Sequence, residues 1–420
     1  MRSGTAPSGL RYAVRRSASP VAWCALSIRC GTRDEAGFPG GIAHFTEHTI
    51  FRGTARKSAS VISGYLDRLG GELNAYTTKE EIVLHATVLK EDLGKAARLL
   101  FELATKATFP DAEIETERGV VLDEIISYKD NPVEDVYDKF EGLLFEGHPL
   151  GAPILGTTAS VRKIRPTDLR RFLKTFFIPS RMAFSAVADI DEKRLEKRVL
   201  GLSDRLFGSG IPSPAPPVRN DIEPVIPSGA EDSPQAPAFD KTIDKRNHEV
   251  HAVIGSRAPS LYEQEDRITA SVLCNILGGP ASNSLLNREL REKNGWVYGV
   301  ECSYTQYADT GIAAISFGCD KPNLERCLTA LDRILTRLRE VPLSERTLKA
   351  YKKQLLGQLA ISSASGEAQC LSMGKSLLAW GRIDSSAEMR TRIEAVTPEA
   401  LQTMAARIFD PERLSRLIYL

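Results

Sequence analysis

GGIAHFTEHTIFRGT, residues 40–54, contains two histidines and a glutamate whose spacing indicates both the local fold and the chemistry of this chain. The pattern predicts a helix over residues 41–51, after Gly40 and before Gly53. On such a helix His44 and His48 are one turn apart, and Glu47 lies on the same side. Two imidazoles in this arrangement can bind one zinc ion, with Glu47 as the base that takes a proton from water. A helix with two structural histidines is the alternative interpretation.

The order H-x-x-E-H is the motif of the inverted zincins. Residues 40–54 also resemble the signature segment of the pitrilysin/insulinase family of zinc metallopeptidases, especially its mitochondrial-processing-peptidase-like branch. In that family a glutamate ligand follows the second histidine by some 76 residues, and Glu124 stands at this distance from His48. The resemblance therefore implies one Zn²⁺ per active site, bound by His44, His48 and Glu124.

The family also carries a supporting glutamate seven residues before the ligand, and Glu117 occupies that position. The segment 111–128 is predicted to be a helix, because Asp111 follows Pro110 as a good N-cap. Glu117 and Glu124 then lie two turns apart on one face of it. We expect Glu124 to complete the coordination and Glu117 to orient the cluster. Solvated carboxylates on a helix surface are the alternative.

Two further segments extend the resemblance. GGELNAYTTKEE (70–81) resembles the family's strand that pairs with the peptide substrate, which implies substrate contacts by Asn74, Ala75 and Tyr76. Turn chemistry beside the glycine pair is an equal alternative for Asn74. Residues 276–304 resemble the segment that supplies an arginine and a tyrosine seven residues apart, and Arg291 and Tyr298 match it. A cation and a phenol of this kind can anchor the peptide backbone and stabilise a developing oxyanion. A surface arginine and a half-buried strand tyrosine are the alternative.

The chain is organised in two halves. Eight prolines between Gly210 and Asp240 predict a linker, so we expect a metal-binding domain over 1–209, a linker over 210–240 and a second domain over 241–420. Residues 81–103 and 311–335 share one pattern of strand, polar turn and amphipathic helix. We predict an α+β fold of two similar domains, each a mainly antiparallel sheet covered by helices. The resemblance implies that the two domains form one half of a clamshell.

Composition excludes several classes of protein. Fifty-five Lys and Arg residues balance fifty-four Asp and Glu residues, so no nucleic-acid or anionic-membrane partner is expected. The seven cysteines include no C-x-x-C pair, which favours a reducing compartment over a disulfide framework. The N-terminal segment has no apolar core of a signal peptide, and no stretch is long enough to span a membrane. We expect a soluble, cytoplasmic protein.

The predicted function is that of a zinc metalloendopeptidase, which hydrolyses peptides or unfolded segments with Glu47 as the general base. Because the family encloses its substrate between two halves and this chain supplies one, a second subunit is implied. The economical hypothesis is a homodimer, in which Arg291 and Tyr298 of one subunit complete the metal site of the other. A non-catalytic scaffold, or a module that binds extended peptides without turnover, is the alternative.

Overall fold

The computed structural model describes residues 1–208 and 238–420, which form two compact units. The first unit consists of residues 1–126, 152–208 and 361–384, and the second of residues 127–151, 238–360 and 385–420. Each unit contains one β-sheet with helices on it, so the predicted α+β class with two mainly antiparallel sheets is confirmed. The predicted linker, 210–240, lies almost wholly outside the described residues, and the predicted domain boundaries stay a prediction.

The sheet of the first unit has six strands in the order β1-β2-β6-β3-β5-β4. Neighbouring strands are antiparallel except for β2 and β6, which are parallel. The strands are β1 (Arg2–Thr5), β2 (Arg11–Arg16), β3 (Val21–Ile28), β4 (Glu72–Thr77), β5 (Ile82–Leu89) and β6 (Met182–Ala188). The helices are α1 (Ile42–Thr49), α2 (Ala59–Asp67), α3 (Leu93–Lys106), the first part of α4 (Asp111–Asp130), α6 (Thr158–Val161), α7 (Pro166–Phe176), α8 (Glu192–Phe207) and α12 (Gly366–Trp380), with the 3-10 helices η1 (Thr32–Asp34), η2 (Lys90–Asp92) and η4 (Pro179–Arg181).

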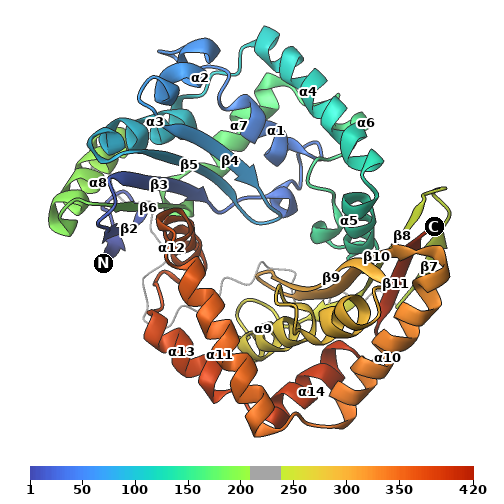
Figure 1. Ribbon diagram of the computed structural model, residues 1–420. Helices are drawn as coiled ribbons and strands as arrows, with labels where there is room; N and C mark the ends of the chain where they lie inside the picture. Colours follow the sequence, from blue (N-terminus) through green and yellow to red (C-terminus); the bar gives the residue numbers. More distant parts are fainter. Residues whose placement is uncertain (209–237) are drawn as a thin grey trace. The chain divides into compact units, whose positions relative to one another are not determined.

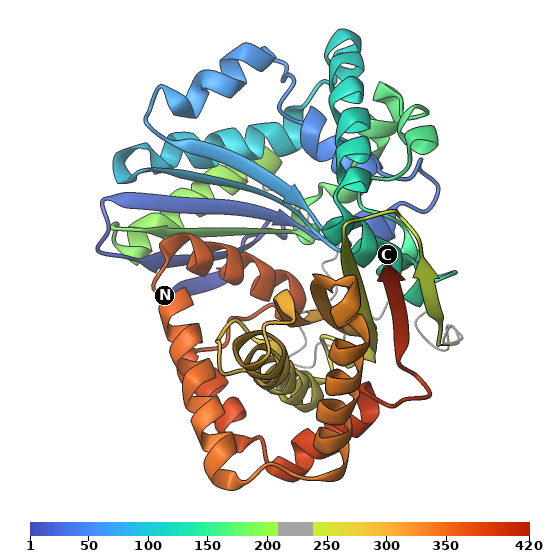
Figure 2. The same ribbon diagram turned by 45° about the vertical axis from the view of Figure 1, so that its right-hand side comes forward.

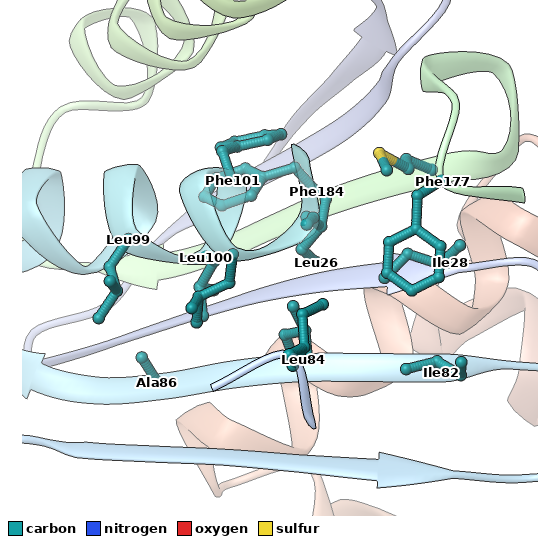
Figure 3. Close-up of a cluster of buried hydrophobic side chains, with 14 of the residues drawn as sticks. Leu26, Ile28, Ile82, Leu84, Ala86, Leu99, Leu100, Phe101, Phe177 and Phe184 are labelled. Atoms are coloured by element: carbon teal, nitrogen blue, oxygen red, sulfur yellow. The ribbon is translucent and has the colours of Figure 1, made fainter. Parts of the chain in front are cut away.

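Both faces of this sheet are covered, and large apolar side chains line one of them. Leu26, Leu84 and Phe184 point to the side of α3, where Phe101 stacks on Phe184 with ring centroids 5.3 Å apart (Figure 3). Because successive strand residues alternate between faces, this set is well separated from the residues on the opposite face. Burial of so many side chains on one face is the main stabilising contribution to this unit.

The opposite face carries alanines and valines together with Trp23 and Tyr76, and it is covered by α12, which lies against β3 and β6 (Figure 1). Two glycines of α12 allow the close approach. A Cβ at Gly366 would lie 2.2 Å from the ring of Trp23, and one at Gly374 would lie 2.5 Å from Oγ of Ser27. A helix from the C-terminal part of the sequence thus completes the first unit.

The sheet of the second unit has five strands in the order β7-β11-β8-β10-β9, antiparallel except for the pair β7 and β11. Helix α5 packs on β8 and β11, and α9 packs on β9 from the other face (Figure 2). The strands are β7 (Asp240–Ile243), β8 (Glu249–Ala258), β9 (Val297–Gln306), β10 (Gly311–Asp320) and β11 (Ser415–Tyr419). The helices are α5 (Pro132–Leu144), α9 (Gln264–Gly278), α10 (Leu324–Glu340), most of α11 (Glu345–Ser362), α13 (Ser386–Ala395) and α14 (Pro398–Ile408), with the short helices η3 (Pro149–Gly151), η5 (Asn287–Lys293, a π-helix) and η6 (Lys321–Asn323).

Several predicted elements are confirmed. The two strand-turn-helix units are β5 with α3 and β10 with α10, and the helices expected over 41–51 and 111–128 are α1 and α4. All seven cysteines are among the described residues, and each is a buried free thiol. Over the described part of the chain, the helices are too short or too polar to cross a membrane.

Candidate metal centre

Helix α1 carries the H-x-x-E-H pattern and is anchored at its start. Gly41 precedes it with φ 85°, and a Cβ there would lie 2.7 Å from the carbonyl oxygen of Leu155, so a glycine is required. The carboxylate of Glu35 accepts hydrogen bonds from the backbone N–H groups of Gly41 (2.8 Å) and Ala43 (2.9 Å). These bonds satisfy orphan donors of the first turn. The fully buried Phe45 packs into the core, which turns the polar face of α1 away from it.

His44, His48 and Glu124 converge, as the sequence predicts. One potential ligand atom from each lies within 4.8 Å of the other two. Oε2 of Glu124 is 3.6 Å from Nε2 of His44 and 3.3 Å from Nε2 of His48. Ligands bound tetrahedrally at zinc distances are about 3.4 Å apart, so these separations suit a zinc ion. Oε2 of Glu124 is buried and has no hydrogen-bond partner among the described residues, which is the state expected of an oxygen meant for a cation.

The protonation state of His44 suits metal binding. Burial, assisted by the nearby His48, lowers the pKa of His44 to about 3, so its imidazole is neutral at physiological pH. A neutral imidazole has a free lone pair, which is the form that coordinates a metal. Nδ1 of His44 is buried and has no hydrogen-bond partner within the described residues, so no hydrogen bond at this nitrogen orients the ring.

Glu117 contacts the ring nitrogen of His48 that does not face Glu124. Its side chain is 2% exposed, and its Oε2 lies 3.2 Å from Nδ1 of His48. Its Oε1 forms an ion pair with Arg52, which the sequence analysis did not identify. A carboxylate that holds the second nitrogen of a ligand histidine sets the tautomer and the ring orientation. Glu117 therefore lies where an orienting residue is needed, and it faces His48 and not the point between the three ligand atoms.

Glu47 lies between the cluster and strand β4. Thr77, the last residue of β4, donates a hydrogen bond of 2.9 Å from Oγ1 to Oε2 of Glu47. Burial raises the pKa of Glu47, and the bond from Thr77 acts in the opposite direction. A carboxylate with a raised pKa is a better proton acceptor near neutral pH. Thr77 was also missed by the sequence analysis, although it follows the Asn74-Ala75-Tyr76 segment directly.

Strand β4 is the outermost strand of its sheet in the described structure. Asn74 is exposed and opposite His85, whereas Ala75 and Tyr76 are half-buried and opposite Leu84 and Val83. The outer edge of such a strand offers N–H and C=O groups to an added strand. The three predicted substrate-binding residues thus lie on an edge that can accept an extended peptide.

Arg291 and Tyr298 belong to the second unit. Arg291 is exposed in η5, and Tyr298 is 56% exposed on β9, the outermost strand of that sheet. The hydroxyl of Tyr298 donates a hydrogen bond of 2.8 Å to Oδ1 of Asp320. Both side chains are accessible in their own unit, and their role stays a prediction.

Comparisons with known proteins find matches over most of the chain. Residues 11–158 match the family model described as insulinase (peptidase family M16), and residues 163–355 match the one described as peptidase M16 inactive domain. An uncharacterized zinc protease of Mycobacterium leprae is 30% identical over 97% of this chain and 88% of its own length. One of Streptomyces coelicolor is 28% identical over 96% of this chain and 86% of its own.

A solved structure shares the fold. The crystal structure of a protease from Helicobacter pylori superposes with a TM-score of 0.88 at 19% identity, covering 100% of this chain and 99% of that one. The resemblance that the sequence analysis drew from residues 40–54 and 124 is thereby confirmed at the level of the family. The chain belongs to the insulinase family of peptidases, peptidase family M16.

Proposed function

We propose that this chain is a zinc-dependent metalloendopeptidase that hydrolyses peptides or extended segments of proteins. The observation that carries the proposal is the convergence of His44, His48 and Glu124 around a buried, unpartnered carboxylate oxygen, with Glu47 beside them. Its relatives are named zinc proteases, which supports the same activity. Zinc at this position would acidify water to a pKa of roughly 7 and polarise a peptide carbonyl.

The residues of the chain divide the remaining work. His44, His48 and Glu124 would hold the metal, and Glu117 with Arg52 would keep His48 in the correct orientation. Glu47 would accept the proton of the attacking water and later transfer it to the leaving nitrogen. Thr77 occupies Oε2 of Glu47, which leaves Oε1 for this proton.

Strand β4 would bind the substrate. A peptide that pairs with its outer edge is held by main-chain hydrogen bonds and needs no particular side chains. Asn74, Ala75 and Tyr76 are the residues of β4 that would contact the peptide near the cleaved bond. This mode favours extended and unfolded segments, because a folded protein has no free strand to offer.

The test is hydrolysis of an unstructured peptide by the purified chain, followed by mass spectrometry of the products. We expect hydrolysis that a chelator abolishes and added zinc restores. Glu47→Gln should retain zinc, since Glu47 is not a ligand, and lose hydrolysis because an amide does not accept the proton. Glu91→Gln, at an exposed position of η2, is the matched control. A fully active Glu47→Gln chain would refute the assignment of the base.

A non-catalytic subunit of the same fold is the second candidate. The match of residues 163–355 to a model described as an inactive domain favours it. Such a protein would bind unstructured peptides and release them intact, with or without zinc. The intact set of His44, His48 and Glu124 argues for the enzyme. A scaffold does not require a buried carboxylate oxygen that lacks a hydrogen-bond partner.

The quaternary structure that we propose is a homodimer in which each subunit is one half of a clamshell. Arg291 and Tyr298 of the partner subunit would complete each active site by contacts with the peptide backbone. Mixing Glu47→Gln chains with Arg291→Ala chains tests this, since a mixed dimer has one site without either substitution. Verified mixed dimers without recovered activity would refute composite sites. A processing-peptidase-like role and a cytoplasmic location stay predictions.

A further inference from the structure

Glu47 has one hydrogen-bond partner in the described structure, and that partner comes from the proposed substrate strand. Oγ1 of Thr77 donates to Oε2 of Glu47 at 2.9 Å. Helix α1 supplies Glu47, whereas Thr77 closes β4, thirty residues later in the chain. The bond therefore joins the element that would hold the metal to the element that would hold the peptide.

We propose that Thr77 is a positioning residue that orients the carboxylate of Glu47 toward the reacting water and links it to β4. This inference rests on the proposed function. A glutamate side chain has three rotatable bonds, so a base on a helix surface samples several positions unless it is held. A hydroxyl that binds Oε2 leaves Oε1 as the free acceptor. It also restricts Glu47 to side-chain conformations in which Oε1 can accept the proton of the water.

Thr77 is itself held firmly. Its backbone is paired with Ile82 of β5, and its β-branched side chain has few rotamers. The turn that follows is fixed as well, because Thr78 donates a hydrogen bond of 2.8 Å from its N–H to the carbonyl oxygen of Glu81. The donor thus has a defined position relative to the sheet, which a residue in a loop would not have.

A second connection fixes α1 relative to the same turn. The carbonyl oxygens of Thr78 and Lys79 accept hydrogen bonds from the N–H groups of Thr32 (3.3 Å) and Arg33 (3.0 Å) in η1. Glu35, directly after η1, holds the first turn of α1 through Gly41 and Ala43. Helix α1 and the end of β4 are therefore connected twice, through η1 with Glu35 and through the bond between Thr77 and Glu47. The bond from Thr77 is the connection that reaches the reacting carboxylate itself.

The position of Thr77 on β4 also matters for the substrate. Thr77 and Ala75 point to one face of the strand, the face on which α1 packs, and Asn74 and Tyr76 point to the other. A peptide on the outer edge of β4 would continue the sheet, so its carbonyl groups would be placed by the same strand that places Glu47. Strand β4 would then position both the base and the substrate.

The experiment replaces Thr77 by Val, which keeps the shape and removes the hydroxyl, and by Ser, which keeps the hydroxyl. Thr87→Val is the matched control, because Thr87 lies on the adjacent strand β5 and is half-buried. We expect Thr77→Val to lower kcat about 10- to 100-fold with KM within about twofold and zinc content unchanged. Thr77→Ser should stay within about threefold of the wild type, and Thr87→Val should equal it.

A binding measurement gives a second readout that does not depend on turnover. A peptide hydroxamate donates a proton to a properly placed carboxylate beside the metal. Thr77→Val should weaken hydroxamate binding about tenfold in the wild-type background and leave it unchanged in the Glu47→Gln background. Equal weakening in both backgrounds would show that Thr77 does not act through Glu47.

Other outcomes are equally decisive. Unchanged kcat in Thr77→Val, or equal losses in Thr77→Val and Thr77→Ser, would overturn the inference. If the wild-type chain cleaves no peptide, the proposed function fails, whereas the hydroxamate comparison still decides the role of Thr77. If Thr77→Val does not fold, Thr77→Ala takes its place with the same expected result.

Discussion

Glu35 is the residue whose ionisation should control the stability of the first unit most visibly. Glu35 is 8% exposed, and it holds the first turn of α1 by accepting hydrogen bonds from Gly41 and Ala43. Burial raises its pKa from 4.5 to about 7. The two backbone N–H groups and the nearby Lys79 lower the pKa and offset part of this effect, whereas Asp34 raises it further.

The sign of the effect follows from the raised pKa. Between pH 4.5 and about 7 the folded chain keeps a proton on Glu35 that the unfolded chain releases. The stabilisation due to this proton is fully present below pH 4.5 and is lost as the pH rises through about 7. A shift from 4.5 to about 7 corresponds to about 3 kcal/mol of unfolding free energy. Glu35→Gln does not titrate, so its own pH dependence lacks this contribution.

The assay is urea denaturation of metal-free wild type and Glu35→Gln between pH 4.5 and 8, in a Trp296→Phe background. Trp296 lies in the second unit, so the remaining tryptophans, Trp23 and Trp380, both report on the first unit. Each substitution leaves the other titrating groups in place, and those that do not interact with Glu35 cancel in the difference between the two proteins.

We expect the stability of the wild type relative to Glu35→Gln to fall by about 3 kcal/mol as the pH rises from 4.5 to 8. A difference that is constant over this range would refute the reasoning. A difference that grows with pH would show that the hydrogen bonds from Gly41 and Ala43 outweigh burial, and that the pKa of Glu35 is lowered.

Three further outcomes are expected from the site and from the packing of α12. Glu117→Gln should weaken zinc binding by about 10- to 100-fold, as measured by competition with a chelator, whereas Glu115→Gln on the exposed side of α4 should not. His48→Ala should abolish stoichiometric zinc, and normal zinc content by elemental analysis would exclude it as a ligand. Gly374→Ala should destabilise the first unit by about 1–3 kcal/mol in urea denaturation, because the new Cβ would lie 2.5 Å from Oγ of Ser27. An unchanged midpoint would show that α12 can move away without cost.

Much of the local structure could be predicted from the sequence. The helices α1 and α4 depend on periodicity and on residues such as Gly40 and Asp111, which act within one or two turns. The pair His44 and His48 is also local, since a helix places residues four apart on one side. Glu124 came from the family resemblance, because no local rule connects residues 76 positions apart.

The segments that complete each unit could not be predicted in this way. Helix α12, from the C-terminal part of the sequence, packs on the first sheet, and α5, from the N-terminal part, packs on the second. An apolar face predicts that a helix is packed against other elements, but it does not indicate which of the two sheets the helix packs on. Only the contacts in the folded chain, such as those of Gly366 with Trp23, make that choice.

The chemistry of the candidate site was therefore determined by the sequence, and its geometry was decided by the tertiary structure. The amino-acid sequence sets which side chains are present and how they are spaced along α1, and imidazole and carboxylate groups are ligands that suit zinc. The approach of Glu124 to the histidines, the support of His48 by Glu117 and the bond from Thr77 to Glu47 each join distant elements. Such contacts form only when burial of the apolar faces brings the helices and strand β4 together, because no isolated segment can hold them against its conformational entropy.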